Sequence, residues 1–220
     1  MKILSTVALL FAAVLSAQAQ EVLETGGNKM PDEWIDQDTK HRVVKLTRME
    51  GRSNLSFYFH NNPFIGSSMV FYSSNKNNVD SVRKQEISTV VSGNRQIHLL
   101  DLKTLKSEQL TYHRLPMNGE IVDNKKGIVY YQIRDTVFSV NAKTKEVKQV
   151  FVFPADFKGT VTAINADGTL LGGAKSSDEE KELFKKYPNK SSYFNIIYEA
   201  MLPRTLFTIN VKTKELDKVH

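Results

Sequence analysis

Short apolar runs separated by polar turns recur along this chain, and three of them share one pattern. Apolar runs at residues 97–100, 137–140 and 206–209 lead into the turns Asp101-Leu102-Lys103-Thr104, Asn141-Ala142-Lys143-Thr144 and Asn210-Val211-Lys212-Thr213. Asp and Asn favour such turns because their side chains bond nearby backbone N–H groups, and an alternating strand follows each turn. Each copy therefore predicts a β-hairpin.

The spacing of these hairpins predicts the fold. Lys103 and Lys143 are 40 residues apart, as expected for four-stranded propeller blades. Another strand pair precedes each of the last two hairpins, at 121–122 with 128–133 and at 161–164 with 169–172. We therefore expect an all-β protein with a β-propeller fold.

A longer spacing before the third hairpin predicts one helical insertion at about 177–200. Ser177 or Asp178 can cap a helix that runs through Lys186, and Pro188 lies just beyond its end. Glutamates at 179, 180 and 182 lie in the early turns, where the helix dipole favours negative charge.

The N-terminus has the order of a secretory signal peptide. Lys2 precedes an apolar run at 3–15, and the small residues Ala17 and Ala19 favour cleavage after residue 19. We expect residues 1–19 to be a signal peptide, 20–35 an irregular leader and 36–220 the propeller blades. The protein is then exported, periplasmic or secreted, with no later membrane span; the alternative is a retained N-terminal anchor.

A fourth, imperfect copy of the turn lies at residues 36–47, with no strand predicted before it. We interpret it as an orphan outer strand, and the whole as an incomplete propeller of about four blades from a larger ring. Open sheet edges then predict self-association. The alternative is a small complete ring of four or five blades.

Charge and composition narrow the function only slightly. The formal net charge is +6, which suits an acidic partner, although lysines scattered over turns for solubility give the same value. The basic run at 181–190 has acidic neighbours and none of the paired features of nucleic-acid binders, so we expect no nucleic acid. The chain contains no cysteine, which excludes disulfides.

From about residue 32 onward the chain resembles the oligogalacturonate lyase family of seven-bladed propellers that degrade pectin. The resemblance rests on residues 39–47, on the aromatic strand 57–64 with 69–71, and on 97–104. It implies β-elimination of pectic oligogalacturonides with a manganese ion held by histidines and a glutamine. The family's catalytic and metal-binding segments lie beyond the last repeat seen here, so we assign no catalytic and no metal-binding residue, and expect this chain alone to be inactive.

A polar and aromatic group near the first full blade is the candidate site for an acidic oligosaccharide. Its members are Arg52, Asn54, Tyr58, His60 and Asn61. Arginine pairs with carboxylates through two hydrogen bonds, and aromatic rings pack on sugars. The alternative is that Phe57 and Phe59 pack on one face while Tyr58 and His60 cover the other. His98 and His113 are expected to be ordinary strand and loop residues.

Two function classes therefore stay open. One is an oligogalacturonate-lyase-like protein, and the other is a non-catalytic periplasmic propeller that binds a glycan or a protein partner.

Overall fold

The computed structural model describes residues 30–59, 61–75, 95–189, 191 and 193–219. The chain divides into two compact units, residues 1–48 and 49–220. The predicted signal peptide lies outside the described residues. Among the residues described, no helix is both long enough and apolar enough to cross a membrane.

The described part of the first unit is a two-stranded hairpin. Strand β1 (Glu33–Ile35) pairs antiparallel with β2 (Arg42–Val44), and Glu33 forms an ion pair with Arg42 across the two strands. The prediction of an irregular leader through residue 35 and of an orphan strand after it was wrong at this point. Three residues are too few to show the alternation by which a strand is recognised in sequence.

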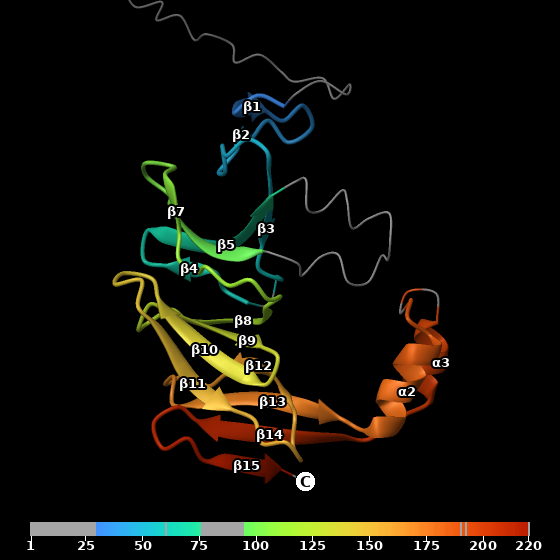
Figure 1. Cartoon of the computed structure of the whole chain (residues 1–220). Coiled ribbons are helices and arrows are strands. Elements are labelled where there is room, and N and C mark those ends of the chain that lie inside the picture. The colour runs from blue at the N-terminus through green and yellow to red at the C-terminus, as the bar shows by residue number, and fades with distance from the viewer. Residues whose placement is uncertain (1–29, 60, 76–94, 190, 192, 220) are drawn as a thin grey trace, which may run out of the picture. The chain divides into compact units, whose positions relative to one another are not determined.

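The described residues of the second unit form three antiparallel blades, rather than the predicted four or so (Figure 1). Each blade has a path of four neighbouring strands in sequence order, and blade 1 has a fifth strand off this path. Blade 1 contains β3 (Arg52–Ser56), β5 (Ser68–Asn75), β6 (Gln96–Asp101) and β7 (Ser107–Gln109), with the short β4 (Phe64–Ile65) also pairing with β5. Blade 2 contains β8 (Asn118–Asp123), β9 (Ile128–Ile133), β10 (Thr136–Asn141) and β11 (Val147–Val152). Blade 3 contains β12 (Thr160–Ile164), β13 (Leu170–Ser176), β14 (Arg204–Asn210) and β15 (Leu216–Val219). The predicted fold class, an all-β and incomplete propeller, is confirmed.

All four predicted turns have the same hydrogen bonds. The Oδ1 atom of Asp101 accepts hydrogen bonds from the backbone N–H groups of Lys103 and Thr104, at 2.9 and 2.7 Å. The equivalent bonds are formed by Asn141 and Asn210, and Asp36 accepts from the N–H of Thr39. Each turn then contains one residue at positive φ: Lys40, Leu105, Lys145 and Lys214. The repeat seen in sequence is therefore a repeat of turn geometry.

Two apolar clusters hold the blades together. The first cluster joins blades 1 and 2 and includes Val70, Tyr72, Ile97, Val129 and Tyr131, all at most 1% exposed. The second joins blades 2 and 3 and includes Val137, Val161, Leu171, Phe207 and Ile209. The side chains of a strand point alternately to the two faces of its sheet. When two blades pack together, the side chains on the two facing sides become buried.

Polar side chains reinforce both blade contacts at one equivalent position. Tyr72 on β5 donates from Oη to the carbonyl of Gly119 in blade 2, at 3.3 Å. Gln132 on β9 donates from Nε2 to the carbonyl of Gly159, just before blade 3, at 2.9 Å. Tyr72 pairs with Ile97, four residues before Asp101, which opens the turn of blade 1. Gln132 pairs in the same way with Val137, four residues before Asn141 in blade 2. The corresponding residue of blade 3 is Ala174, which carries no hydrogen-bonding side chain.

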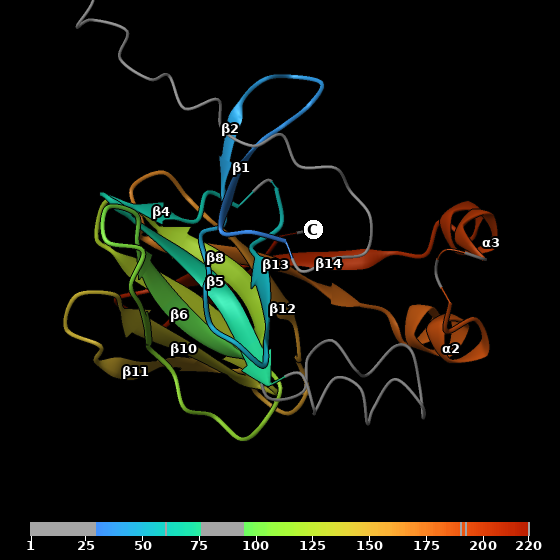
Figure 2. The ribbon, with the colours of Figure 1, turned by 90° about the horizontal axis from the view of Figure 1, so that it is seen from above.

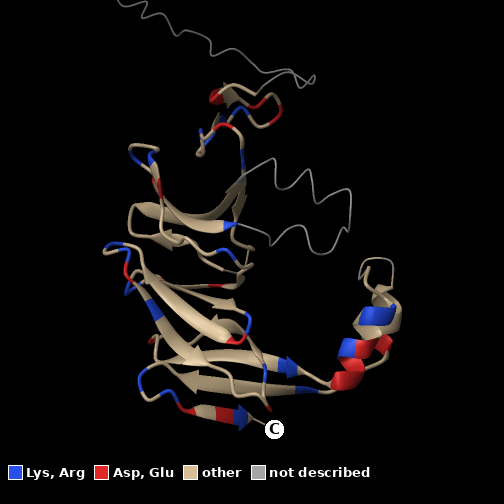
Figure 3. Cartoon of the chain, in the orientation of Figure 1, with Lys and Arg blue, Asp and Glu red and all other residues tan. Residues whose placement is uncertain are grey.

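The predicted helical insertion lies between β13 and β14. Helix α2 (Asp178–Lys186) is capped by Ser177, whose hydroxyl accepts from the N–H of Glu180 at 3.1 Å, and α3 (Phe194–Glu199) follows. Both helices project past the ends of β13 and β14, away from the blades (Figures 1 and 2). Acidic residues occupy the first turn of α2 and basic residues the last (Figure 3), as the helix dipole favours.

Phe207 is the aromatic centre of the second cluster. Its ring meets those of Phe153 and Phe157 edge to face, with centroids 5.3 and 5.6 Å apart. Gly159 and Gly173 make room for it, because a Cβ at either residue would lie 2.3 or 2.7 Å from the ring. The packing of blade 3 thus depends on the Phe207 ring, which lies directly against the backbone of two glycines.

We predict that Phe207→Ala lowers the free energy of unfolding by about 3–5 kcal/mol, because it leaves a cavity that rigid sheets cannot fill. Urea denaturation measures the change. The matched control is Phe59→Ala, since Phe59 is 86% exposed, and it should change the free energy by less than about 0.5 kcal/mol. Equal effects of the two variants would contradict this account of the core.

Candidate functional site

The structure does not gather the predicted site residues in one place. Arg52 and Asn54 lie on the same face of β3, whereas Tyr58 and Asn61 follow the opposite end of that strand. The strand between them is roughly 13 Å long. His60 lies outside the described residues. The four described residues therefore divide between the two ends of β3, at two edges of blade 1.

At one edge, Arg52 and Asn54 belong to a polar network. Arg52 donates from Nε to the hydroxyl of Ser73 at 2.6 Å, and this hydroxyl donates to Oδ1 of Asn54 at 2.7 Å. The Nη2 atom of Arg52 lies 3.4 Å from Nε2 of His98. Ser73 is fully buried and His98 is 4% exposed. His98 is therefore a buried member of a polar network rather than an ordinary strand residue.

The electrostatics of this network keep His98 neutral. Burial, followed by the nearby charge of Arg52, lowers the pKa of His98 to about 4. Arginine can only donate, so Nε2 accepts and the proton resides on Nδ1. Nδ1 is buried and has no hydrogen-bond partner among the residues that the structure describes. His98 is poorly suited to act as a base near neutral pH, because its lone pair faces a guanidinium.

At the other edge, the backbone N–H of Tyr58 donates to Oε2 of Glu120 on β8, at 2.9 Å. Glu120 also lies 3.9 Å from Arg95, whose guanidinium covers the ring of Tyr72 at 4.1 Å. Tyr58 itself is 60% exposed, and its ring lies at a tilt of 46° to that of Phe59. This segment joins blades 1 and 2 and leaves an aromatic side chain facing solvent.

The other described histidines do not form a metal site. His41 lies in the turn region of the first unit, and Nε2 of His113 is 2.8 Å from the hydroxyl of Tyr131. Within the part of the chain that the structure describes, no group of three or more His, Asp or Glu side chains could hold a metal ion. The described residues therefore do not provide a site that fits the manganese ion that the family resemblance implies.

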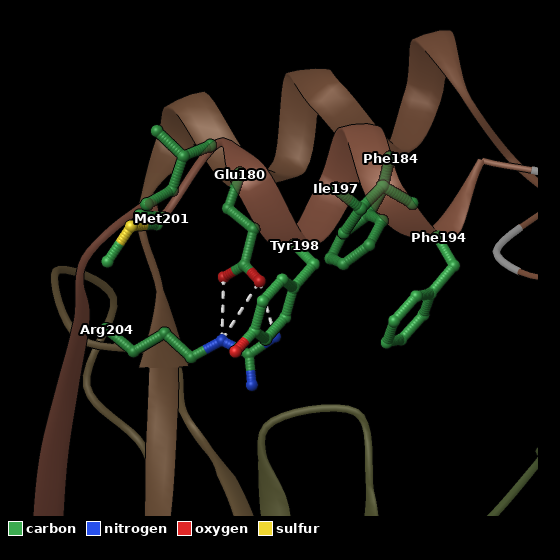
Figure 4. A pocket seen from close by; sticks show the side chains of 8 residues that line it. Glu180, Phe184, Phe194, Ile197, Tyr198, Met201 and Arg204 are labelled. Atoms are coloured by element: carbon green, nitrogen blue, oxygen red, sulfur yellow. Dashed lines mark hydrogen bonds and ion pairs between the residues drawn. The ribbon is translucent and has the colours of Figure 1, made fainter.

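A pocket that the sequence did not reveal lies at the helical insertion (Figure 4). It has a volume of about 340 Å³ and is bounded by α2, α3 and the start of β14. Glu180 and Arg204 lie at its base, and Phe194, Ile197, Tyr198 and Met201 form an apolar side. Phe194, Ile197 and Tyr198 are spaced three and four residues apart on α3, and this spacing on one helix face was the available signal in the sequence.

The ion pair in this pocket is formed across 24 residues of sequence. Nε of Arg204 donates to both carboxylate oxygens of Glu180, at 2.9 and 3.0 Å, and Nη2 donates to Oε1. Hydrogen bonding to Glu180 raises the pKa of Arg204 above its ordinary value. Glu180 is buried, whereas about half of the Arg204 side chain is exposed. The guanidinium is thus fixed in place with one side open to the pocket.

We predict that His98 makes stability depend on pH. The unfolded chain binds a proton at His98 near pH 6.5, whereas the folded chain binds it only near pH 4, so stability is lost as pH falls through this window. The loss reaches about 3 kcal/mol at pH 4. His98→Gln should flatten the difference in unfolding free energy between pH 7 and pH 4.5. The same slope in the variant and in the original chain would contradict the assignment.

Comparisons with known proteins support the fold. A scan against protein-family models finds no match, and a search of curated proteins also finds none. Among solved structures, oligogalacturonate lyase from Vibrio parahaemolyticus has a TM-score of 0.66 and 21% identity over 86% of this chain. An oligogalacturonate lyase in complex with manganese has a TM-score of 0.64 and 23% identity over 85% of this chain.

The chain spans just under half the length of these two proteins, 46% in each case. At this identity the similarity concerns the fold. In its fold, the chain therefore resembles these two lyases, as the sequence indicated, and it has the blade architecture of part of such a propeller.

Proposed function

We propose that this chain is an oligogalacturonate-lyase-like propeller that binds acidic oligosaccharides of the pectic type and does not cleave them by itself. The observation that carries the proposal is the shared blade architecture, which extends over 85–86% of the chain in both lyase comparisons. The net charge of +6 and the arginine side chains at blade edges suit a ligand that carries carboxylates. Residues 1–19 have the sequence pattern of a secretory signal peptide, which supports action outside the cytoplasm.

The proposal that this chain does not cleave the sugar is supported by what β-elimination requires. A base must remove the proton next to the uronate carboxylate, while a cation neutralises the growing negative charge. His98 is buried against Arg52 with a pKa of about 4, and His113 lies against Tyr131. Among the described residues, neither His98 nor His113 belongs to a group that could hold a metal ion. Of the predicted contacts, the exposed Tyr58 and the neighbouring Asn61 are the ones we propose to touch ligand.

Calorimetric titration with trigalacturonate tests the proposal. We expect saturable binding that weakens as salt is raised, because part of the attraction is between charges. The control ligand is a neutral galactose trimer of the same length, which should bind at least tenfold more weakly. Equal binding of the two sugars, or no binding of either, would overturn the proposed ligand class.

The second part of the proposal is tested by ultraviolet absorbance. β-Elimination creates an unsaturated uronate that absorbs ultraviolet light, whereas binding creates no new double bond. We expect a flat trace for this chain with trigalacturonate and Mn²⁺. A steady rise that depends on protein concentration would show that the chain is itself a lyase.

A further inference from the structure

We propose that the pocket between α2, α3 and β14 binds one uronate residue of an acidic oligosaccharide, with Arg204 holding the carboxylate and Tyr198 the sugar ring. This inference rests on the proposed function, and adds a second place of binding to the contacts proposed at Tyr58 and Asn61. The pocket lies in the helical insertion, far along the chain from the predicted residues on β3.

The dimensions of the pocket suit a small ligand. Its volume of about 340 Å³ falls at the lower end of the range for small-molecule sites, which are mostly apolar with a few fixed polar groups. Here the apolar side comes from α3 and from Phe184 of α2, and the polar groups are Glu180 and Arg204 (Figure 4). A folded protein partner would need a much larger contact area.

Arg204 presents a definite edge for a carboxylate. A guanidinium has a side edge, formed by Nε and Nη2, and an end edge, formed by Nη1 and Nη2. Glu180 occupies the side edge, and no bond to Nη1 is seen among the described residues. The end edge can therefore accept a second carboxylate through two parallel bonds. Because Glu180 already fixes the side chain, little conformational freedom is lost on binding.

Phe194 and Tyr198 supply the surface for the ring. Their own rings are nearly parallel, at 13°, with centroids 5.8 Å apart, and they are 61% and 72% exposed. They lie one helical turn apart on α3, and both line the pocket. A sugar ring carries C–H groups on its faces and hydroxyls on its rim, so it can cover this surface while its hydroxyls stay in water.

The combination favours a charged sugar over other small ligands. An apolar ligand would leave the open edge of Arg204 desolvated without a partner, which is unfavourable. A simple inorganic anion would use Arg204 and leave both aromatic rings exposed. A uronate satisfies both features, since it carries a carboxylate on a ring with apolar faces.

Two aromatic variants test the site. Tyr198→Ala and Phe194→Ala remove exposed side chains and should leave the fold intact, as circular dichroism and thermal melting will show. We expect each to weaken trigalacturonate binding at least fivefold in calorimetry. The matched control is Ile196→Ala: Ile196 is 45% exposed on the same helix but does not line the pocket, and its loss should change the affinity by less than twofold.

A third variant tests the carboxylate contact. Arg204→Lys keeps the positive charge but removes the planar edge, so affinity for trigalacturonate should fall at least tenfold. Affinity for a galactose trimer should not change. The melting temperature reports whether loss of the Glu180 contact has disturbed the helices; should it fall sharply, the chemical shift changes of the Tyr198 ring protons on titration decide the point in the original chain.

The outcomes separate this inference from the function on which it rests. Binding of trigalacturonate that is unchanged in Tyr198→Ala would overturn the site and leave the proposed function standing. Absence of binding to the original chain would overturn both. Self-association of the chain that disappears in Tyr198→Ala would show that a second copy occupies the pocket, and would also overturn the inference.

Discussion

Packing of one blade face on the next is the interaction on which the rest of the second unit depends. An antiparallel sheet of four short strands cannot bury its own faces, and isolated small sheets are marginally stable in water. Val70 and Tyr72 of blade 1 are buried because blade 2 covers them, and Val137 of blade 2 because blade 3 does. At about 25 cal/mol per Å² of apolar surface, these contacts dominate the stability.

Apolar packing does not by itself fix how one blade is aligned with the next, and hydrogen bonds between the blades do so. Tyr72 and Gln132 each reach a backbone carbonyl at the start of the following blade, so the strands cannot slide past one another without leaving a buried polar group unsatisfied. Where blade 3 has Ala174 at the equivalent position, this device is missing. The repeat is therefore regular in its turns and irregular in the side chains that link its blades.

The candidate chemistry lies where the regular sheets are interrupted. Arg52 and the buried His98 belong to a polar network in which burial lowers the pKa of His98, as expected of framework groups. Arg204, in contrast, is fixed by Glu180 and half exposed beside two solvent-facing aromatic rings. Loops and insertions on a rigid scaffold are the usual places for binding groups, because they escape the packing demands of the core.

The sequence by itself determined the hairpins, the blade spacing and the α2 helix, because turn residues, strand alternation and capping act over a few neighbouring positions. Asp101, Asn141 and Asn210 each accept a hydrogen bond from a backbone N–H group two residues further on, and Ser177 caps α2 through a residue three positions away. The short β1 was missed, since three residues carry no readable period. Only the tertiary structure decided that His98 is buried beside Arg52 and that Glu180 meets Arg204. These relations depend on register and on contacts between residues far apart in the chain, and no local pattern of residues encodes them.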